Sequence, residues 1–227
     1  MSSEFDAYSA KYTELLRDPL RDGFASAAFF HVRKWTLIRE FWKRRGVGLP
    51  SLDWLDIGCG QGDLLRLGAT GFRSAAGCDP SREMLQPIAG AVLKHQKSPA
   101  ELPFESGAFD FATAVCVYHH VDASLRAPLT AEAGRVLRSG GVLAIIEHNP
   151  WNPVTQAIVR RSPVDAGAHL LTARRCRELV RRTGLDVLAT EHFLYLPELL
   201  YGYAAQVERA LSRLPMGGQY AVFARKR

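Results

Sequence analysis

The segment Leu55–Asp63 places three glycines at alternate positions directly after an apolar run. Because glycine has no Cβ and tolerates positive φ, such a turn lets the backbone approach a bound ligand closely. The turn also opens a helix, whose first N–H groups have no partner within the helix. Asp79 follows about 20 residues later, a spacing typical of a carboxylate that binds ribose at the end of the next parallel strand. The pair predicts a site for a nucleoside-containing cofactor.

Further side chains that can move protons lie directly after two other apolar runs. His119 and His120 follow residues 109–117, and Glu147 and His148 end the run that begins at residue 142. A histidine at such a position can act as a general base or hydrogen-bond an acceptor, although a histidine bonded to backbone is an equally good interpretation. Strand alternation predicts that one histidine of the first pair faces the cleft, and we favour His119. The candidates for catalysis are therefore His119, His120, His148 and Glu147.

The elements that must position these residues alternate between strand and helix. Strands are predicted at residues 52–57, 75–78, 92–96, 109–117 and 142–147, and helices at residues 62–67, 81–90 and 127–137. Such alternation of apolar strands with helices predicts a parallel sheet covered by helices on both faces.

The two ends of the chain differ from this pattern. Residues 1–50 are predicted to be helical, with one helix at residues 27–45 that buries a stripe formed by Val32, Trp35, Ile38, Phe41 and Trp42. The tail predicts helices at residues 172–183 and 198–214, and two strands at residues 185–195 and 219–224 that are antiparallel at the sheet edge.

Composition favours one globular α/β domain. The chain has 227 residues, of which 47% are hydrophobic and 23% are charged. No apolar run reaches the roughly 18 residues of a membrane span, and the acidic N-terminus lacks the apolar stretch of a signal peptide. The four cysteines are scattered without metal-ligand spacing and are interpreted as reduced thiols. We therefore expect a cytoplasmic protein with no bound metal.

The chain is basic, with a net charge of +6 and an isoelectric point near 9.3. Arginines and lysines gather at residues 43–45 and 174–182. A nucleic-acid surface is one interpretation. A solvated helix face is the one we favour.

Five motifs in order resemble the class I S-adenosylmethionine-dependent methyltransferases. They are the glycine loop at residues 56–62, Gly77-Cys78-Asp79, Leu102-Pro103-Phe104 leading to Phe109-Asp110, residues 116–121, and Leu137-Arg138-Ser139-Gly140-Gly141. The resemblance covers residues 50–150 most strongly. It implies a Rossmann-like, doubly wound, mostly parallel seven-stranded sheet with an antiparallel edge strand. It also implies an N-terminal helical lid at residues 1–50, a cofactor-binding core at residues 51–150 and a substrate-side segment at residues 151–227, within one domain.

The resemblance also implies S-adenosylmethionine as cofactor and assigns roles to individual residues. Asp56, Gly58 and Gly60 are expected at its methionine part, and Asp79 at the ribose hydroxyls. The set of expected cofactor-binding residues is Asp56, Gly58, Cys59, Gly60, Asp79, Pro80, Ser98, Cys116, Val117 and Tyr12. Ser98 stands where family members often have an aspartate that contacts the adenine amine, so this chain departs from the pattern there.

A dinucleotide-dependent oxidoreductase is the nearest rival for the glycine loop. Its fingerprint requires glycine or alanine at the third position of G-x-G-x-x-G, where the helix packs closely on the strand. This chain has Asp63 at that position, with Gly62 before it. The loop therefore favours the methyltransferase.

The acceptor is expected to be a small molecule methylated on oxygen, nitrogen or carbon. Tyr8, Asn149, Trp151 and Arg160 are the expected substrate-binding residues. Relatives with a similar Glu-His-Asn-Pro-x-Asn-Pro stretch are bacterial small-molecule enzymes, often in natural-product or surface-sugar biosynthesis. Two alternatives remain open: an RNA methyltransferase that uses the arginine-rich faces, and a repurposed fold that binds the cofactor without transferring its methyl group. The sequence predicts no membrane partner and does not indicate an oligomeric state.

Overall fold

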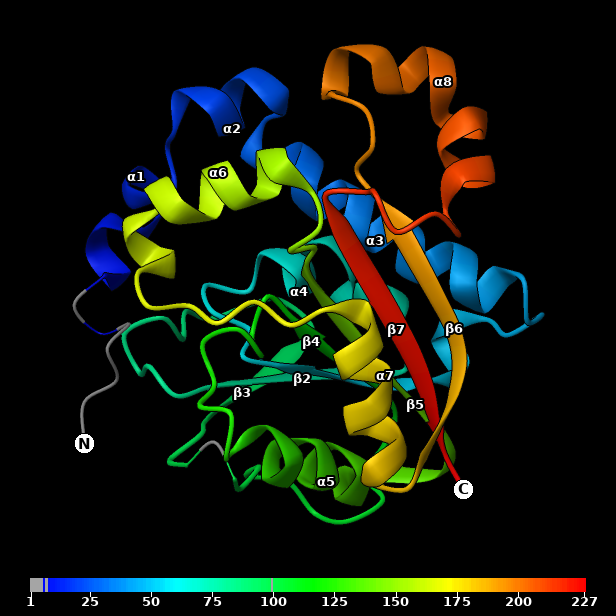
Figure 1. Cartoon of the computed structure of the whole chain (residues 1–227). Helices are drawn as coiled ribbons and strands as arrows, with labels where there is room; N and C mark the ends of the chain where they lie inside the picture. Colours follow the sequence, from blue (N-terminus) through cyan, green and yellow to red (C-terminus); the bar gives the residue numbers. More distant parts are fainter. Residues whose placement is uncertain (1–5, 7, 99) are drawn as a thin grey trace.

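Seven strands form one sheet in the order β3-β2-β1-β4-β5-β7-β6 in a computed structural model that describes residues 6, 8–98 and 100–227 (Figure 1). The strands are β1 (Asp53–Ile57), β2 (Ser74–Asp79), β3 (Ala91–His95), β4 (Phe109–Val115), β5 (Leu137–His148), β6 (Leu185–Phe193) and β7 (Gln219–Lys226). Strands β1 to β5 are parallel, whereas β7 is antiparallel to both β5 and β6. This arrangement confirms the Rossmann-like fold class, with the reversed strand lying between β5 and the edge strand β6.

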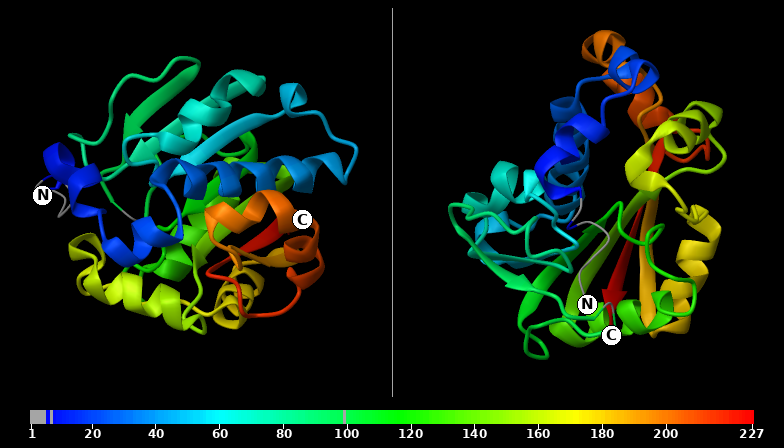
Figure 2. Two further views of the ribbon diagram at one scale, coloured as in Figure 1. Left: turned by 90° about the horizontal axis from the view of Figure 1, so that it is seen from above. Right: turned by 90° about the vertical axis from the view of Figure 1, so that its left-hand side faces the viewer.

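Helices cover both faces of the sheet, as Figure 2 shows. The α-helices are α1 (Tyr12–Leu15), α2 (Pro19–Phe24), α3 (Ala27–Lys43), α4 (Asp63–Gly68), α5 (Arg126–Val136), α6 (Pro153–Arg161), α7 (Ala173–Arg182) and α8 (Glu198–Leu211). Helices α3 and α4 pack on one face, and α5 and α7 pack on the other. None of the helices among the described residues is long and apolar enough to cross a membrane.

The core consists of two layers because side chains alternate across each strand. Trp54 of β1 and Phe111 of β4 face the layer of α3 and α4, whereas Leu55 and Ala112 face the layer of α5 and α7. All four side chains are completely buried. Burial on both faces explains why these strands read as continuous apolar runs in the sequence.

The structure corrects part of the apolar stripe that the sequence predicted for α3. Ser26 caps the helix by accepting a hydrogen bond from the Phe29 N–H at 3.1 Å. Val32 is 44% exposed, whereas the neighbouring Arg33 and Lys34 are buried. Ile38, Phe41 and Trp42 are buried as predicted, so the predicted stripe is wrong only at Val32, and Arg33 forms a buried ion pair with Glu208 of α8.

One predicted helix is wrong, and one helix was not predicted. Residues 81–90 form turns and no helix, although the Ser81 hydroxyl accepts a hydrogen bond from the Met84 N–H at 3.3 Å. Pro87 has no N–H to continue a helix, so the capped turn does not propagate. Helix α6 was not predicted, yet Asn152 caps it by accepting from the Thr155 N–H at 2.9 Å, and Pro153 occupies its first position.

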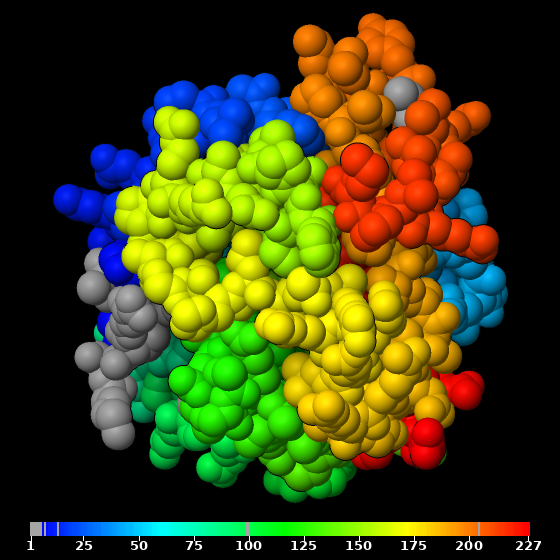
Figure 3. Space-filling view, in the orientation of Figure 1, coloured from blue at the N-terminus to red at the C-terminus, as the bar shows by residue number. Residues whose placement is uncertain are grey.

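Helices α1, α2 and α6 lie at the end of the sheet where the parallel strands finish (Figures 1 and 2). An ion pair of 2.9 Å joins Arg161 of α6 to Asp18, the residue that caps α2. In the space-filling view, residues 150–172 cover the front of this region between the N-terminal helices and α8 (Figure 3). The carboxyl ends of the parallel strands are therefore covered by the N-terminal helices α1 and α2 and by the segment around α6.

Candidate functional site

A cavity of about 600 Å³ opens where the carboxyl ends of four strands meet. Its lining includes Asp56 from β1, Asp79 from β2 and His148 from β5, together with Cys116, the residue after β4. Strands β1 and β4 are neighbours, although their crossovers run in opposite directions along the sheet. Such a switch point is where open α/β sheets bind ligands.

The glycine loop brings its backbone to the floor of this cavity. Gly58 has φ of +66°, and a Cβ at that position would lie 2.5 Å from Cγ2 of Val117. Gly60 has φ of +53°, and its N–H donates a hydrogen bond of 2.8 Å to the Asp79 carboxylate. Glycine is therefore required at residue 58 both by conformation and by space.

Asp79 is fixed by backbone donors at the end of β2. Its two carboxylate oxygens accept hydrogen bonds from the N–H groups of Gly60 and Ser81, the latter at 2.9 Å. The side chain is almost completely buried, and this burial raises the pKa of its carboxyl above the ordinary value. A carboxylate held in this way still has lone pairs for a ligand hydroxyl.

Asp56 is the second buried carboxylate of the cavity. The Thr113 hydroxyl donates a hydrogen bond of 2.6 Å to it. Burial raises the pKa of Asp56 to about 7, although Thr113 and the charge of Lys34 act in the opposite direction. A cationic ligand group near Asp56 would stabilise its charged form.

Cys116 stands at the centre of a polar cluster above β4. Its φ is +57°, which is unusual for a residue other than glycine. Its sulfur lies 3.6 Å from the Lys34 Nζ and 3.7 Å from the Gln219 Nε2. Burial acts to raise the pKa of this thiol, but the charges of Lys34 and His148 outweigh it and lower the pKa to about 7.

His119 lies between two carboxylates. Its Nδ1 is 2.5 Å from the Glu147 carboxylate, and its Nε2 is 3.3 Å from Asp165. Burial acts to lower the pKa of His119, but Glu147 and Asp165 overcome it and raise the pKa to about 10. In this arrangement the imidazole is held as a cation and does not act as a proton acceptor.

The two other histidines at this end of the cavity, His120 and His148, differ from His119. The pKa of His120 is lowered to about 4 by burial and by the charge of His119, so His120 is neutral at pH 7. The His148 ring lies 5.1 Å from the His119 ring and lines the cavity beside Cys116. Glu147 is completely buried behind His119, where it also accepts hydrogen bonds from the N–H groups of Val117 and Tyr118.

The structure brings most of the predicted site residues to one cavity. The lining includes Tyr12, Asp56, Gly58, Cys59, Gly60, Asp79, Pro80, Cys116, Val117, His119, His120 and His148. Glu147 does not line the cavity itself but contacts two residues that do, His119 and Val117.

Five other predicted residues do not line the cavity: Tyr8, Ser98, Asn149, Trp151 and Arg160. The Asn149 amide donates to the carbonyls of Pro215 and Gly217 and fixes that turn. Trp151 is 71% exposed, and Arg160 donates a hydrogen bond to Gln156 on the surface of α6. Gln96 lines the cavity in place of Ser98, whose carbonyl accepts a hydrogen bond from the Gln96 amide.

Other residues of the cavity were missed at the sequence level. Lys34, His31 and Arg21 line it from the N-terminal helices, and Gln219 lines it from β7. Lys34 lies three residues after His31, so the two share a helix face. A histidine and a lysine that share one helix face are the signal that could have identified this part of the lining.

The family model described as a methyltransferase domain matches residues 55–145. This range begins in β1, contains the glycine loop and Asp79, and ends within β5. No relative was found among the curated protein sequences.

Solved structures that resemble the chain include several S-adenosylmethionine-dependent methyltransferases. One, a possible histamine N-methyltransferase from Thermotoga maritima, is 18% identical, with a TM-score of 0.69 and 98% of each chain covered. A second is from the complex of the Haloferax volcanii Trm112 methyltransferase activator with a proposed methyltransferase (20% identity, TM-score 0.65, 99% of this chain and 98% of that chain). A third is geranyl diphosphate C-methyltransferase from Streptomyces coelicolor (17% identity, TM-score 0.60, 85% and 78%). At these identities the likeness shows the fold alone.

Proposed function

We propose that the chain is a class I S-adenosylmethionine-dependent methyltransferase and that it transfers the methyl group to a small-molecule acceptor inside the cavity. The observation that carries this proposal is the size of the cavity and its place at the carboxyl ends of the strands. Its volume of about 600 Å³ lies within the range of small-molecule sites, about 300–1,000 Å³. The ion pair between Asp18 and Arg161 holds α2 and α6 together over it.

The cofactor would occupy the end of the cavity that is lined by Asp56 and Asp79. Asp79 would accept hydrogen bonds from the ribose hydroxyls, and Asp56 would face the ammonium of the methionine part. The rest of the proposed cofactor set is Tyr12, Gly58, Cys59, Gly60, Pro80, Cys116 and Val117. Gln96 takes the place of Ser98 as the residue proposed to contact the adenine amine, because its side chain lines the cavity.

The acceptor would occupy the end beside the histidines and α6. A sulfonium makes its methyl group electrophilic, so the protein mainly aligns the two reactants and excludes water. Where the nucleophile must lose a proton, His148 is the proposed acceptor, because it lines the cavity. His120 also lines the cavity, but its lowered pKa of about 4 makes it a weak base. His119 and Glu147 would position this wall, since His119 is held as a cation by Glu147 and Asp165.

The placement of the basic residues supports a small acceptor over RNA. Arg44 and Arg45 directly follow α3, ten and eleven residues after Lys34. At the usual helix rise of about 1.5 Å per residue, they lie about 15 Å from Lys34 along the helix axis. Arg44 forms an ion pair with Glu191, and Arg45 stacks on the Phe41 ring. The names of the Thermotoga and Streptomyces proteins refer to histamine and geranyl diphosphate, which are small molecules. RNA as acceptor remains an outcome of the test below.

The proposal is tested by calorimetric titration with S-adenosylhomocysteine and by transfer of a labelled methyl group. We expect Asp79→Ala to lose most of the affinity, because the ribose hydroxyls lose their acceptor. Asp186→Ala is the control, since Asp186 pairs with Arg227 on the exposed surface. Unchanged affinity in Asp79→Ala would reject the assigned cofactor site.

Transfer assays separate the acceptor classes. The wild-type protein should label a compound from a small-molecule panel and leave RNA unlabelled. Labelled RNA, with retention that falls steeply as salt rises, would favour the RNA methyltransferase. Cofactor binding without transfer to any acceptor would favour the repurposed fold.

A further inference from the structure

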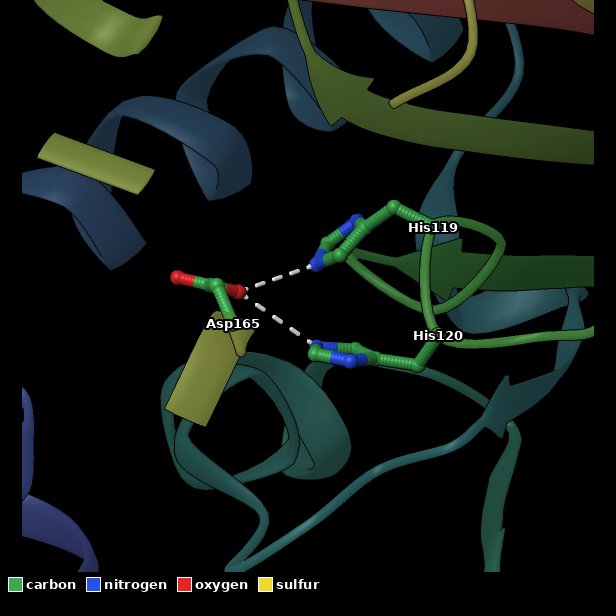
Figure 4. Close-up of side chains that lie close together, drawn as sticks. All are labelled: His119, His120 and Asp165. Atoms are coloured by element: carbon green, nitrogen blue, oxygen red, sulfur yellow. Dashed lines mark hydrogen bonds and ion pairs between the residues drawn. The ribbon is translucent and has the colours of Figure 1, made fainter. Parts of the chain in front are cut away.

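Three side chains that commonly bind metals converge on one wall of the cavity. His119 and His120 follow β4, and Asp165 ends the short 3-10 helix Pro163–Asp165. The Asp165 Oδ1 lies 3.3 Å from the His119 Nε2 and 3.5 Å from the His120 Nε2. Figure 4 shows both rings directed at this carboxylate. No other group of this kind occurs among the described residues.

The spacing of the three donor atoms fits a bound ion. An ion about 2.1 Å from each donor places adjacent donors roughly 3.0–3.4 Å apart at tetrahedral or octahedral angles. The observed separations of 3.3 and 3.5 Å are close to this range. All three atoms lie within 4.8 Å of one another, and ion binding would require the two imidazole nitrogens to approach to about the same separation.

Glu147 gives this group the support that metal-binding histidines usually have. Its carboxylate lies 2.5 Å from the His119 Nδ1 and is itself held by the N–H groups of Val117 and Tyr118. An Nδ1–H that donates to a buried carboxylate leaves Nε2 directed toward the cavity. The same carboxylate–histidine arrangement orients histidine ligands in many metal sites.

We propose that His119, His120 and Asp165 bind one divalent ion of the zinc and iron type. Imidazole nitrogens suit these ions, whereas magnesium and calcium prefer oxygen donors alone. The ion would replace the proton that Glu147 and Asp165 otherwise hold on His119. The sequence had predicted no metal, because His119 and His120 are adjacent without a typical ligand spacing and Asp165 lies far from them in the chain.

An ion bound by His119, His120 and Asp165 would have open coordination positions toward the cavity. The proposed acceptor lies in the part of the cavity beside these histidines. This part of the inference rests on the proposed function. It favours an acceptor with an oxygen donor, such as a hydroxyl group, over a purely hydrocarbon one.

The test is titration of tag-free, chelator-treated protein with Zn²⁺, followed by calorimetry, with Co²⁺ absorption as a spectroscopic check. We expect one Zn²⁺ per chain. Asp165→Asn and His120→Asn should each weaken binding by at least about tenfold. Both side chains are partly exposed, and asparagine keeps a polar group there, so these variants are expected to fold.

The matched control is His31→Asn. His31 also lines the cavity beside a carboxylate, with its Nε2 3.6 Å from Asp63, but it belongs to no three-residue group among the described residues. Its Zn²⁺ affinity should equal that of the wild type. Absence of Zn²⁺ binding, or equal binding by Asp165→Asn, would overturn the proposal and leave a charged hydrogen-bonded triad.

Binding of S-adenosylhomocysteine is measured on the same samples. Protein that binds this compound but no Zn²⁺ refutes the metal site and leaves the methyltransferase proposal intact. Protein that binds Zn²⁺ as expected but not S-adenosylhomocysteine supports the metal site and refutes the proposed cofactor site.

Discussion

Replacement of Asp56 by asparagine should remove most of the pH dependence of cofactor binding. Asp56 is completely enclosed, and burial raises its pKa from the ordinary 3.8 to about 7. Its ionised form would attract the ammonium of the cofactor, whereas its protonated form would not. Cofactor affinity should therefore rise as the pH rises through 7.

The size of this effect follows from the fraction of Asp56 that is ionised. With a pKa of about 7, this fraction falls from about three quarters at pH 7.5 to about 3% at pH 5.5. If only the ionised form binds, affinity for S-adenosylhomocysteine falls about 25-fold over this interval. The pKa of Asp79 is also raised, so Asp79 adds a smaller pH dependence of cofactor affinity in both the wild-type protein and Asp56→Asn.

The Asp56 carboxyl should also make the free energy of unfolding depend on pH in the absence of cofactor. Its pKa is higher in the folded protein than in the unfolded chain, so its contribution to stability is complete below about pH 4 and lost as the pH rises through 7. The rise from 3.8 to about 7 corresponds to at most roughly 4 kcal/mol at about 1.4 kcal/mol per tenfold change. Asp56→Asn should therefore raise the free energy of unfolding at pH 8.

Calorimetric titration at several pH values and urea unfolding at pH 5 and pH 8 measure both effects. Thr113→Val is a useful comparison, because it removes the hydrogen bond to Asp56 and should raise the pKa of Asp56 further. A flat affinity profile in the wild-type protein would refute this reasoning. An equally steep profile in Asp56→Asn would assign the dependence to another group.

Two further predictions concern a thiol and a buried ion pair. Iodoacetamide should modify Cys116 faster than the other cysteines, with a rate that rises through pH 7, and Lys34→Met should slow this reaction, as mass spectrometry would detect. Equal labelling of all four cysteines would contradict the pKa argument. Glu208→Ala should lower the free energy of unfolding by about 3–5 kcal/mol, because it leaves the buried Arg33 unpaired. Asp186→Ala, which breaks an exposed pair, should leave the free energy of unfolding almost unchanged in the same urea titration, and equal losses in the two variants would contradict the reasoning.

The order of strands and helices in the core could be predicted because each apolar run is bounded by glycine, proline or a polar turn. Prediction failed where local signals compete with tertiary packing. Residues 81–90 have a capping serine but also Pro87, which stops the helix. Val32 fits the stripe by its spacing of three residues from Trp35, yet at 3.6 residues per turn it lies about 120° around the helix from Ile38 and is exposed.

The gathering of Asp56, Asp79 and Cys116 in one cavity could be predicted, because these residues end or follow strands and parallel strands end at one edge. The rest of the cavity lining could not, because it is built by segments that meet only in three dimensions. Lys34 reaches Cys116 from the N-terminal helices, and Asp165 reaches His119 from the chain beyond α6. Trp151 and Asn149, chosen for their polar and aromatic chemistry, instead lie on the surface and at the turn before β7.

A crystal structure with S-adenosylhomocysteine bound tests the central claim most directly. It should place the ribose hydroxyls at Asp79, the methionine part beside Asp56 and Gly58, and the sulfur facing the open space near His120 and His148. Density for the ligand outside this cavity, or a ribose away from Asp79, would contradict the assignment of the carboxyl edge of the sheet as the site of methyl transfer.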